Sequence, residues 1–174
     1  MEAEEALAEI AAEVRTCTKC DLHIGAHNGV PGSGNPHAEV FLTNLVRPRV
    51  PDGRALRPDE IAACRDYLSR QIAAVNPLVI VALGRGAAAR FLPGVRISQD
   101  HGQAKVAGGR IVVAMYNPAA ALHREELRQT VMNDFERALP AAIAEARRLA
   151  AEGKLARPEA TRPEEPPPEQ LRLF

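Results

Sequence analysis

Two almost uninterrupted apolar runs constrain the fold of this chain more than any other feature. Residues 78–83 read LVIVAL and residues 110–115 read RIVVAM. A strand that is apolar at successive positions needs cover on both faces of its sheet, which is typical of parallel sheets packed between helices. The stretch 39–46 (EVFLTNLV) is also apolar and β-branched, and it predicts a third buried strand.

Helical patterns separate these strands. Residues 2–14 carry an apolar stripe at helical spacing, and a second helix should begin near Pro58, because proline is favoured in a first helical turn. A short helix is expected over 87–91, and a long one after Pro118 that Pro140 should kink or restart. The alternation predicts a three-layer α/β/α sandwich with a short parallel sheet.

Binding sites in such sheets lie at the carboxyl ends of the strands. Here those ends are followed by residues 44–47, by Gly84–Arg85 and by Tyr116–Asn117. These three segments are therefore the first places to look for functional side chains.

The composition changes near Gly153. Residues 153–169 are rich in proline and glutamate and have almost no apolar side chains. Such a segment cannot repay the entropy of ordering, so we expect a disordered linker there. The organisation predicted is one domain over 1–152, the linker, and a short apolar peptide, QLRLF, at 170–174.

Charge and hydropathy say little about partners. Lys+Arg and Asp+Glu both number 22, so the net charge neither indicates nor excludes a nucleic-acid partner. No apolar run approaches the roughly 18 residues of a membrane span, and the acidic start MEAEEALAEI lacks the basic region of a signal peptide. We expect a cytoplasmic monomer.

Cys17 and Cys20 are separated by two residues, which is the spacing of a metal site. Zinc and iron–sulfur sites normally take four ligands, yet the chain has only one further cysteine, Cys64. Cys64 falls on the apolar stripe of the helix that begins near Pro58. A buried plain thiol is therefore an alternative to a metal ligand.

Six stretches taken together resemble the family-4, iron–sulfur type of uracil-DNA glycosylase, in that family's order, over roughly residues 5–139. They are CTKCDLH (17–23), VPGSGNP (30–36), TNLV (43–46) with the Pro/Arg-rich loop after it, RPDEIAACRDYL (57–68), VIVALGRGAAARF (79–91) and YNPAAAL (116–122). The resemblance implies a four-stranded parallel sheet, a [4Fe–4S] cluster held by four cysteines, and base-excision repair. In that repair the enzyme flips uracil out of DNA and hydrolyses its N-glycosidic bond.

One unit of the family pattern is missing. It comprises the first strand, the Gly-Glu-Ala-Pro-Gly loop that positions the attacking water, and the phenylalanine that stacks on uracil. Here NPHAEV (35–40) runs directly into FLTNLV (41–46). We expect a sheet that lacks one central strand, with residues 39–46 in the vacated position. The alternative is a damaged gene product that packs poorly.

The resemblance also assigns roles to single residues. Asn117 stands where the family has the histidine that donates a hydrogen bond to the leaving uracil, and Asn44 matches the asparagine that reads the edge of the base. As an alternative, Asn44 is a turn former at a strand end. Arg85, Arg47 and Arg49 are candidate contacts to the DNA backbone, or solvated loop residues.

Cys17, Cys20 and Cys64 match three of the family's four cluster ligands. The fourth position is Pro48, whose side chain has no ligand atom. Two alternatives stay open: an oxygen-labile cluster with an open iron or a non-cysteine ligand, and three plain thiols.

The C-terminal peptide resembles the pentapeptide that binds the bacterial sliding clamp. Leu171, Leu173 and Phe174 would enter an apolar cleft, and Gln170 would meet its polar rim. Two functions from different classes follow: a DNA N-glycosylase, and a catalytically inactive, clamp-tethered DNA-binding relative.

Overall fold

The computed structural model describes residues 3–24, 29–34, 40–46 and 54–155. These residues form two compact units that divide between Asn76 and Pro77. We call them the first unit and the second unit. The predicted disordered linker was placed one turn too early, because Leu155 is 8% exposed and packs in the core of the second unit. Residues 156–169 and the QLRLF peptide lie outside the described residues.

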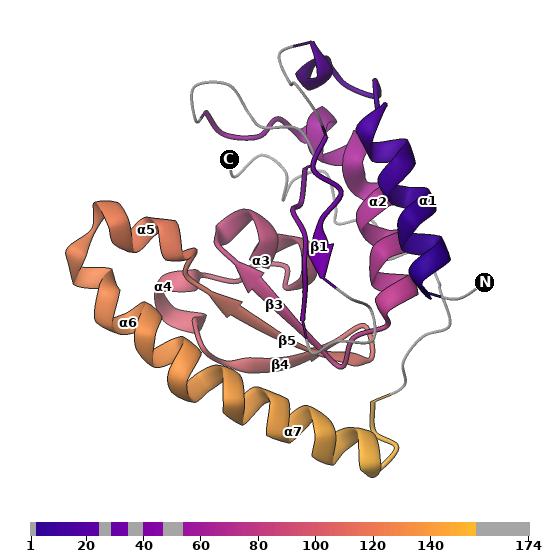
Figure 1. Ribbon diagram of the computed structural model, residues 1–174. Coiled ribbons are helices and arrows are strands. Elements are labelled where there is room, and N and C mark those ends of the chain that lie inside the picture. Colours follow the sequence, from indigo (N-terminus) through magenta and orange to yellow (C-terminus); the bar gives the residue numbers. More distant parts are fainter. Residues whose placement is uncertain (1–2, 25–28, 35–39, 47–53, 156–174) are drawn as a thin grey trace. The chain divides into compact units, whose positions relative to one another are not determined.

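The first unit is built on two helices, α1 (Ala3–Arg15) and α2 (Pro58–Val75) (Figure 1). Ile10 and Val14 of α1 pack against Tyr67 of α2, and Arg70 makes a 2.7 Å ion pair with Glu13. The predicted start of α2 at Pro58 is confirmed. A one-turn 3-10 helix, η1 (Asp21–His23), follows the thiol pair.

The prediction of a buried central strand over 39–46 is wrong. Only β2 (Phe41–Leu42) is extended among the described residues of that stretch, and it pairs antiparallel with β1 (Ser33–Gly34) in a separate two-stranded sheet. Leu42 is 61% exposed. Close backbone approach by glycines explains the local pairing, because a Cβ on Gly34 would lie 2.6 Å from the carbonyl oxygen of Val40.

The second unit contains the main sheet, with strand order β3-β5-β4. β3 (Val79–Leu83) and β5 (Arg110–Met115) are parallel, as predicted, with Leu83 opposite Met115. β4 (Ala104–Ala107), which the sequence patterns missed, joins β5 through the Gly108–Gly109 turn and is antiparallel to it. The sheet is therefore mixed.

Helices cover both faces of this sheet, and the predicted three-layer arrangement is confirmed within the second unit. Val112 and Ala114 of β5 pack against α3 (Arg85–Phe91) and α4 (Ile97–Asp100). Ile111, Val113 and Met115 point to the other face, which α7 (Leu139–Ala151) covers (Figure 1). All six residues of β5 are buried, Arg110 included, and cover on both faces explains why the five residues after Arg110 are apolar.

The expected long helix after Pro118 is broken into shorter pieces. These are α5 (Pro118–His123), η3 (Glu125–Leu127), α6 (Arg128–Asn133), the π-helical turn η4 (Asp134–Ala138) and α7. The predicted restart at Pro140 is confirmed, since this residue lies in the first turn of α7 and has no N–H to donate. No helix within the described ranges has the length and hydropathy to cross a membrane.

Candidate active site

The carboxyl ends of β3 and β5 meet where the sequence placed its candidate residues. The Gly84 N–H donates to the Met115 carbonyl over 2.8 Å, which joins the two strand ends. Gly84 has φ of +88°, a backbone region that L side chains rarely adopt, and a Cβ there would lie 3.4 Å from Cβ of Asn117. The turn therefore brings Asn117 close to the start of α3, where Arg85 is the first residue and is exposed.

Asn117 is the N-cap of α5. Its Oδ1 accepts a hydrogen bond from the Ala119 N–H at 3.0 Å, which fixes the rotamer of the side-chain amide. The amide oxygen is thus engaged by the helix, and the Nδ2 group provides the donors. Asn117 itself is exposed. Its placement suits a hydrogen-bond donor directed at a bound molecule.

A histidine–carboxylate pair braces the turn before Asn117. Nδ1 of His101 lies 3.0 and 2.9 Å from the two carboxylate oxygens of Asp134, and the His101 ring lies 5.2 Å from the ring of Tyr116. Asp134 is only 5% exposed. The sequence analysis missed this pair, because no local pattern links residues 33 positions apart.

Asn44 belongs to the first unit, where it is exposed in the segment after β2. The neighbouring Thr43 hydroxyl donates to Oε1 of the buried Gln71 at 2.8 Å. Arg47 and Arg49, the two other candidate DNA contacts, lie outside the described residues.

The three candidate metal ligands all lie in the first unit. Cys64 is 1% exposed and belongs to an apolar cluster with Leu22, against which Cys20 packs. Cys17 packs on the α1–α2 contact instead, beside Tyr67. Burial, and next the hydrogen bond to Cys17, raise the pKa of the Tyr67 hydroxyl.

These thiols do not fit a complete cluster as they are placed. Across the described part of the chain, no group of three or more His, Cys, Asp or Glu side chains is arranged to hold one metal ion. Pro48, which stands at the family's remaining ligand position, lies outside that part.

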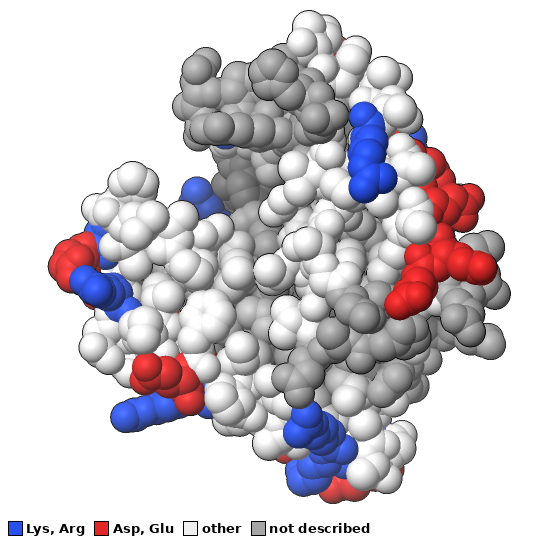
Figure 2. Space-filling model, viewed as in Figure 1, with Lys and Arg blue, Asp and Glu red and all other residues white. Residues whose placement is uncertain are grey.

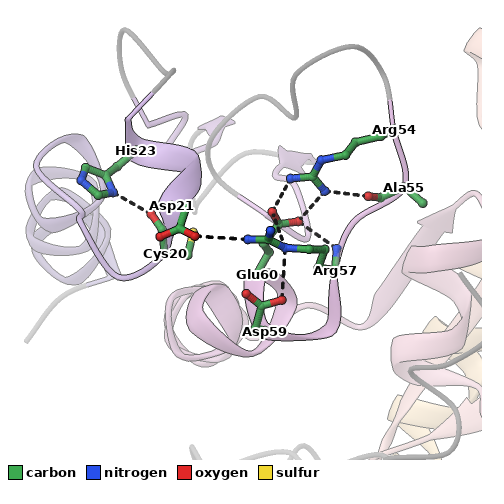
Figure 3. A network of polar contacts seen from close by, with 8 residues as sticks. All are labelled: Cys20, Asp21, His23, Arg54, Ala55, Arg57, Asp59 and Glu60. Atoms are coloured by element: carbon green, nitrogen blue, oxygen red, sulfur yellow. Dashed lines mark hydrogen bonds and ion pairs between the residues drawn. The ribbon is translucent and has the colours of Figure 1, made fainter.

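A network of charged side chains holds the segment that carries Cys20 to the start of α2 (Figure 3). Its centre is Glu60, whose carboxylate is fully buried and accepts hydrogen bonds from Arg54 at 2.5 and 3.1 Å. Arg57 donates its backbone N–H to Glu60 at 2.8 Å and pairs with Asp21 of η1 at 3.5 Å. The Arg54 guanidinium group therefore stabilises the fold by pairing with a buried carboxylate.

The candidate site residues that the structure describes lie neither on the acidic surface of α1 nor around the cavity of the first unit. Acidic side chains gather over α1 in Figure 2, and Glu4 and Glu5 lie in its first turn. Such a surface repels phosphate. A cavity of about 380 Å³ in the first unit lies among α1, Pro31–Gly34 and Phe41, and none of the candidate site residues lines it.

Comparison with known proteins decides the family. Residues 5–140 match the model of the uracil DNA glycosylase superfamily. The chain belongs to this superfamily. It is 31% identical over 182 positions to the type-4 uracil-DNA glycosylase of Archaeoglobus fulgidus, covering 76% of this chain and 92% of the relative. It is 30% identical to the type-4 enzyme of Thermotoga maritima, covering 79% and 96%.

The alignment with the Archaeoglobus enzyme also shows how much shorter this chain is over the matched region. In the Archaeoglobus comparison, 76% of the 174 residues is about 132 residues, so about 50 of the 182 aligned positions have no counterpart in this chain. The chain is thus an internally shortened member of the uracil-DNA glycosylase superfamily. Gly84 and Asn117, at the carboxyl edge of its sheet, lie within the matched region.

Proposed function

We propose that this protein is a uracil-DNA glycosylase of base-excision repair, which hydrolyses the N-glycosidic bond of deoxyuridine in DNA. The observation that carries the proposal is the match to this superfamily over residues 5–140, with relatives named type-4 uracil-DNA glycosylases. Such an enzyme works where the cell keeps its DNA, so the proposal includes a cytoplasmic location, and we take the protein as a monomer.

Two asparagines carry the chemistry in this proposal. Asn44 reads the Watson–Crick edge of the flipped uracil with its side-chain amide, and Asn117 donates from Nδ2 to the negative charge that develops on the leaving base. The hydrogen bond from the Ala119 N–H holds the Asn117 amide before substrate arrives, which is how a preorganised donor lowers a barrier. Bond cleavage leaves the sugar to an attacking water.

The missing unit favours one competing function. The water-positioning glutamate and the stacking phenylalanine have no match in this sequence, and about 50 positions of a relative are absent. A chain without them can still bind DNA without cleaving the bond. A catalytically inactive DNA-binding relative is therefore the second candidate.

A single-turnover assay separates the two candidates. Protein purified without oxygen is mixed in excess with a labelled, uracil-containing single strand, and alkali then cuts any abasic site. We expect cleavage above the no-protein control and its loss in Asn44→Ala. Intact DNA after incubation with a chain shown to be folded by circular dichroism would favour the inactive relative.

Backbone contacts to DNA are proposed for Arg85, Arg47 and Arg49. Arg85 is exposed at the start of α3, next to Gly84 and thus near Asn117. Guanidinium groups beside a base-binding site typically position the strand through its phosphates.

We further propose that Cys17, Cys20 and Cys64 bind an incomplete, oxygen-labile iron–sulfur cluster. The family positions of the three thiols and the shared packing of Cys20 and Cys64 support it. Binding requires the segment of Cys17 and Cys20 to close on Cys64, and no catalytic step depends on it. We expect iron and acid-labile sulfide in anaerobic preparations, both lost in air and in Cys20→Ser. Anaerobic protein without iron would contradict the proposal.

The QLRLF peptide is proposed to bind the bacterial sliding clamp, and the Pro/Glu-rich residues 153–169 to act as its spacer from a glycosylase domain at 1–152. Gln170, Leu171, Leu173 and Phe174 supply the contacts. A peptide of residues 165–174 is expected to displace a known clamp ligand, whereas one with Leu173 and Phe174 changed to Ala is not. No displacement at high micromolar peptide would refute the interaction.

A further inference from the structure

One buried side chain connects the segment before β1 to the segment after β2 in the first unit. Gln71 of α2 is 2% exposed, and both ends of its amide are engaged. Its Oε1 accepts from the Thr43 hydroxyl at 2.8 Å, and its Nε2 donates to the carbonyl oxygen of Pro31. Pro31 and Thr43 lie on either side of the short β1–β2 pair.

This connection matters because it anchors the residue directly before Asn44, while Leu45 and Val46 on the other side pack in the apolar cluster around Cys64. The strand before Asn44, β2, has only two residues, and Asn44 itself is exposed. Thr43 is the residue directly before Asn44, and its hydroxyl is held on the rigid 18-residue helix α2. An amide as buried as Gln71 keeps such partners, since leaving one unsatisfied is costly.

We propose that Gln71 is a positioning residue for Asn44, acting through Thr43 to set the direction in which the Asn44 amide meets uracil. This inference rests on the proposed function. Gln71 touches no substrate in this account. Its effect is on recognition of the base, and not on the hydrogen bond from Asn117 to the leaving uracil.

The test compares two substitutions at Thr43, one that removes the hydroxyl and one that keeps it. Thr43→Val removes the donor to Gln71 and keeps the β-branched shape, whereas Thr43→Ser keeps the donor. In single-turnover assays Thr43→Val should raise the protein concentration for half-maximal rate about tenfold, because a small misplacement of a binding group is costly. The maximal rate should change less than about threefold, and Thr43→Ser should resemble the wild type.

A double-mutant cycle asks whether the effect passes through Asn44. If it does, Thr43→Val causes little further loss in an Asn44→Ala background, measured as binding of the uracil strand. Gln71→Met, of similar shape but without the amide, should reproduce Thr43→Val. Hydrogen exchange at the backbone amides of residues 41–46 should rise in both variants and stay at the wild-type level in Thr43→Ser.

Three results would overturn the inference: equal behaviour of Thr43→Val and Thr43→Ser, additive losses with Asn44→Ala, or unchanged exchange at residues 41–46. A wild-type chain that cleaves nothing refutes the glycosylase function separately. The inference is then decided by affinity for a uracil strand against the matching thymine strand. Thr43→Val should erase that preference and Thr43→Ser keep it, and a wild type without any preference refutes the positioning role.

Discussion

Replacing Asn117 with Asp is expected to slow cleavage of the N-glycosidic bond by a factor on the order of 10²–10³. The fold should stay nearly as stable as before. Asp keeps an oxygen that accepts the Ala119 N–H, so the N-cap of α5 survives. It loses the Nδ2 donor and places a negative charge where uracil itself becomes negative. The measurement is the maximal single-turnover rate beside a urea melt of each variant.

Two further substitutions at the same position serve as controls. Asn117→Ala removes donor and cap together without adding a charge. It should therefore slow the reaction no more than Asn117→Asp does, and it should also lower the free energy of unfolding by about 1 kcal/mol. Asn117→His restores the residue that the family has there and should raise the rate above wild type. An Asn117→Asp protein with wild-type rate would exclude Asn117 from the chemistry.

The second large effect is expected at Glu60, where Glu60→Gln should lower the free energy of unfolding by about 3 kcal/mol. The carboxylate is fully buried and receives hydrogen bonds from Arg54 and from the Arg57 backbone. A neutral amide leaves two guanidinium groups without their shared anion. Because both arginines keep partial contact with water, at 39% and 48% side-chain exposure, the loss belongs at the lower end for buried pairs.

Urea denaturation of Glu60→Gln beside Glu125→Gln provides the check. Glu125 pairs with Arg128 at 3.4 Å on the surface, so its substitution should change the free energy of unfolding by less than about 0.5 kcal/mol. Equal midpoints for wild type and Glu60→Gln would show that the network in Figure 3 contributes no stability.

The same carboxylate makes stability depend on pH. The hydrogen bond from Arg54 is the main cause that holds the pKa of Glu60 below its usual value of 4.5. Burial acts in the opposite direction, and the hydrogen bond from the Arg57 N–H lowers the pKa further. A group with a lowered folded-state pKa stabilises the protein above its unfolded pKa, and this contribution is lost as pH falls through the folded value. The stability gap between wild type and Glu60→Gln should therefore be full at neutral pH and shrink below about pH 4.5.

Much of the candidate site was predictable from short patterns. The thiol pair at Cys17 and Cys20, the exposed Asn117 after a buried strand, and Gly84 before a helix can each be recognised from a few neighbouring residues. Their partners could not be recognised in this way. Gln71 lies 28 residues from Thr43, and His101 lies 33 residues from Asp134. The local sequence around each of these residues does not indicate its partner.

The sequence by itself determined the α/β class, the parallel pair of strands at 78–83 and 110–115, the start of α2 at Pro58 and membership of the glycosylase superfamily. Hydrophobic periodicity and helix-start signals involve residues that are neighbours along the chain, so they can be recognised without a structure. Only the tertiary structure decided that β2 pairs with β1 instead of entering the main sheet, and that β4 adds an antiparallel strand. Strand pairing depends on which backbone segments the fold brings side by side. An apolar stretch such as 39–46 does not by itself specify the strand with which it pairs.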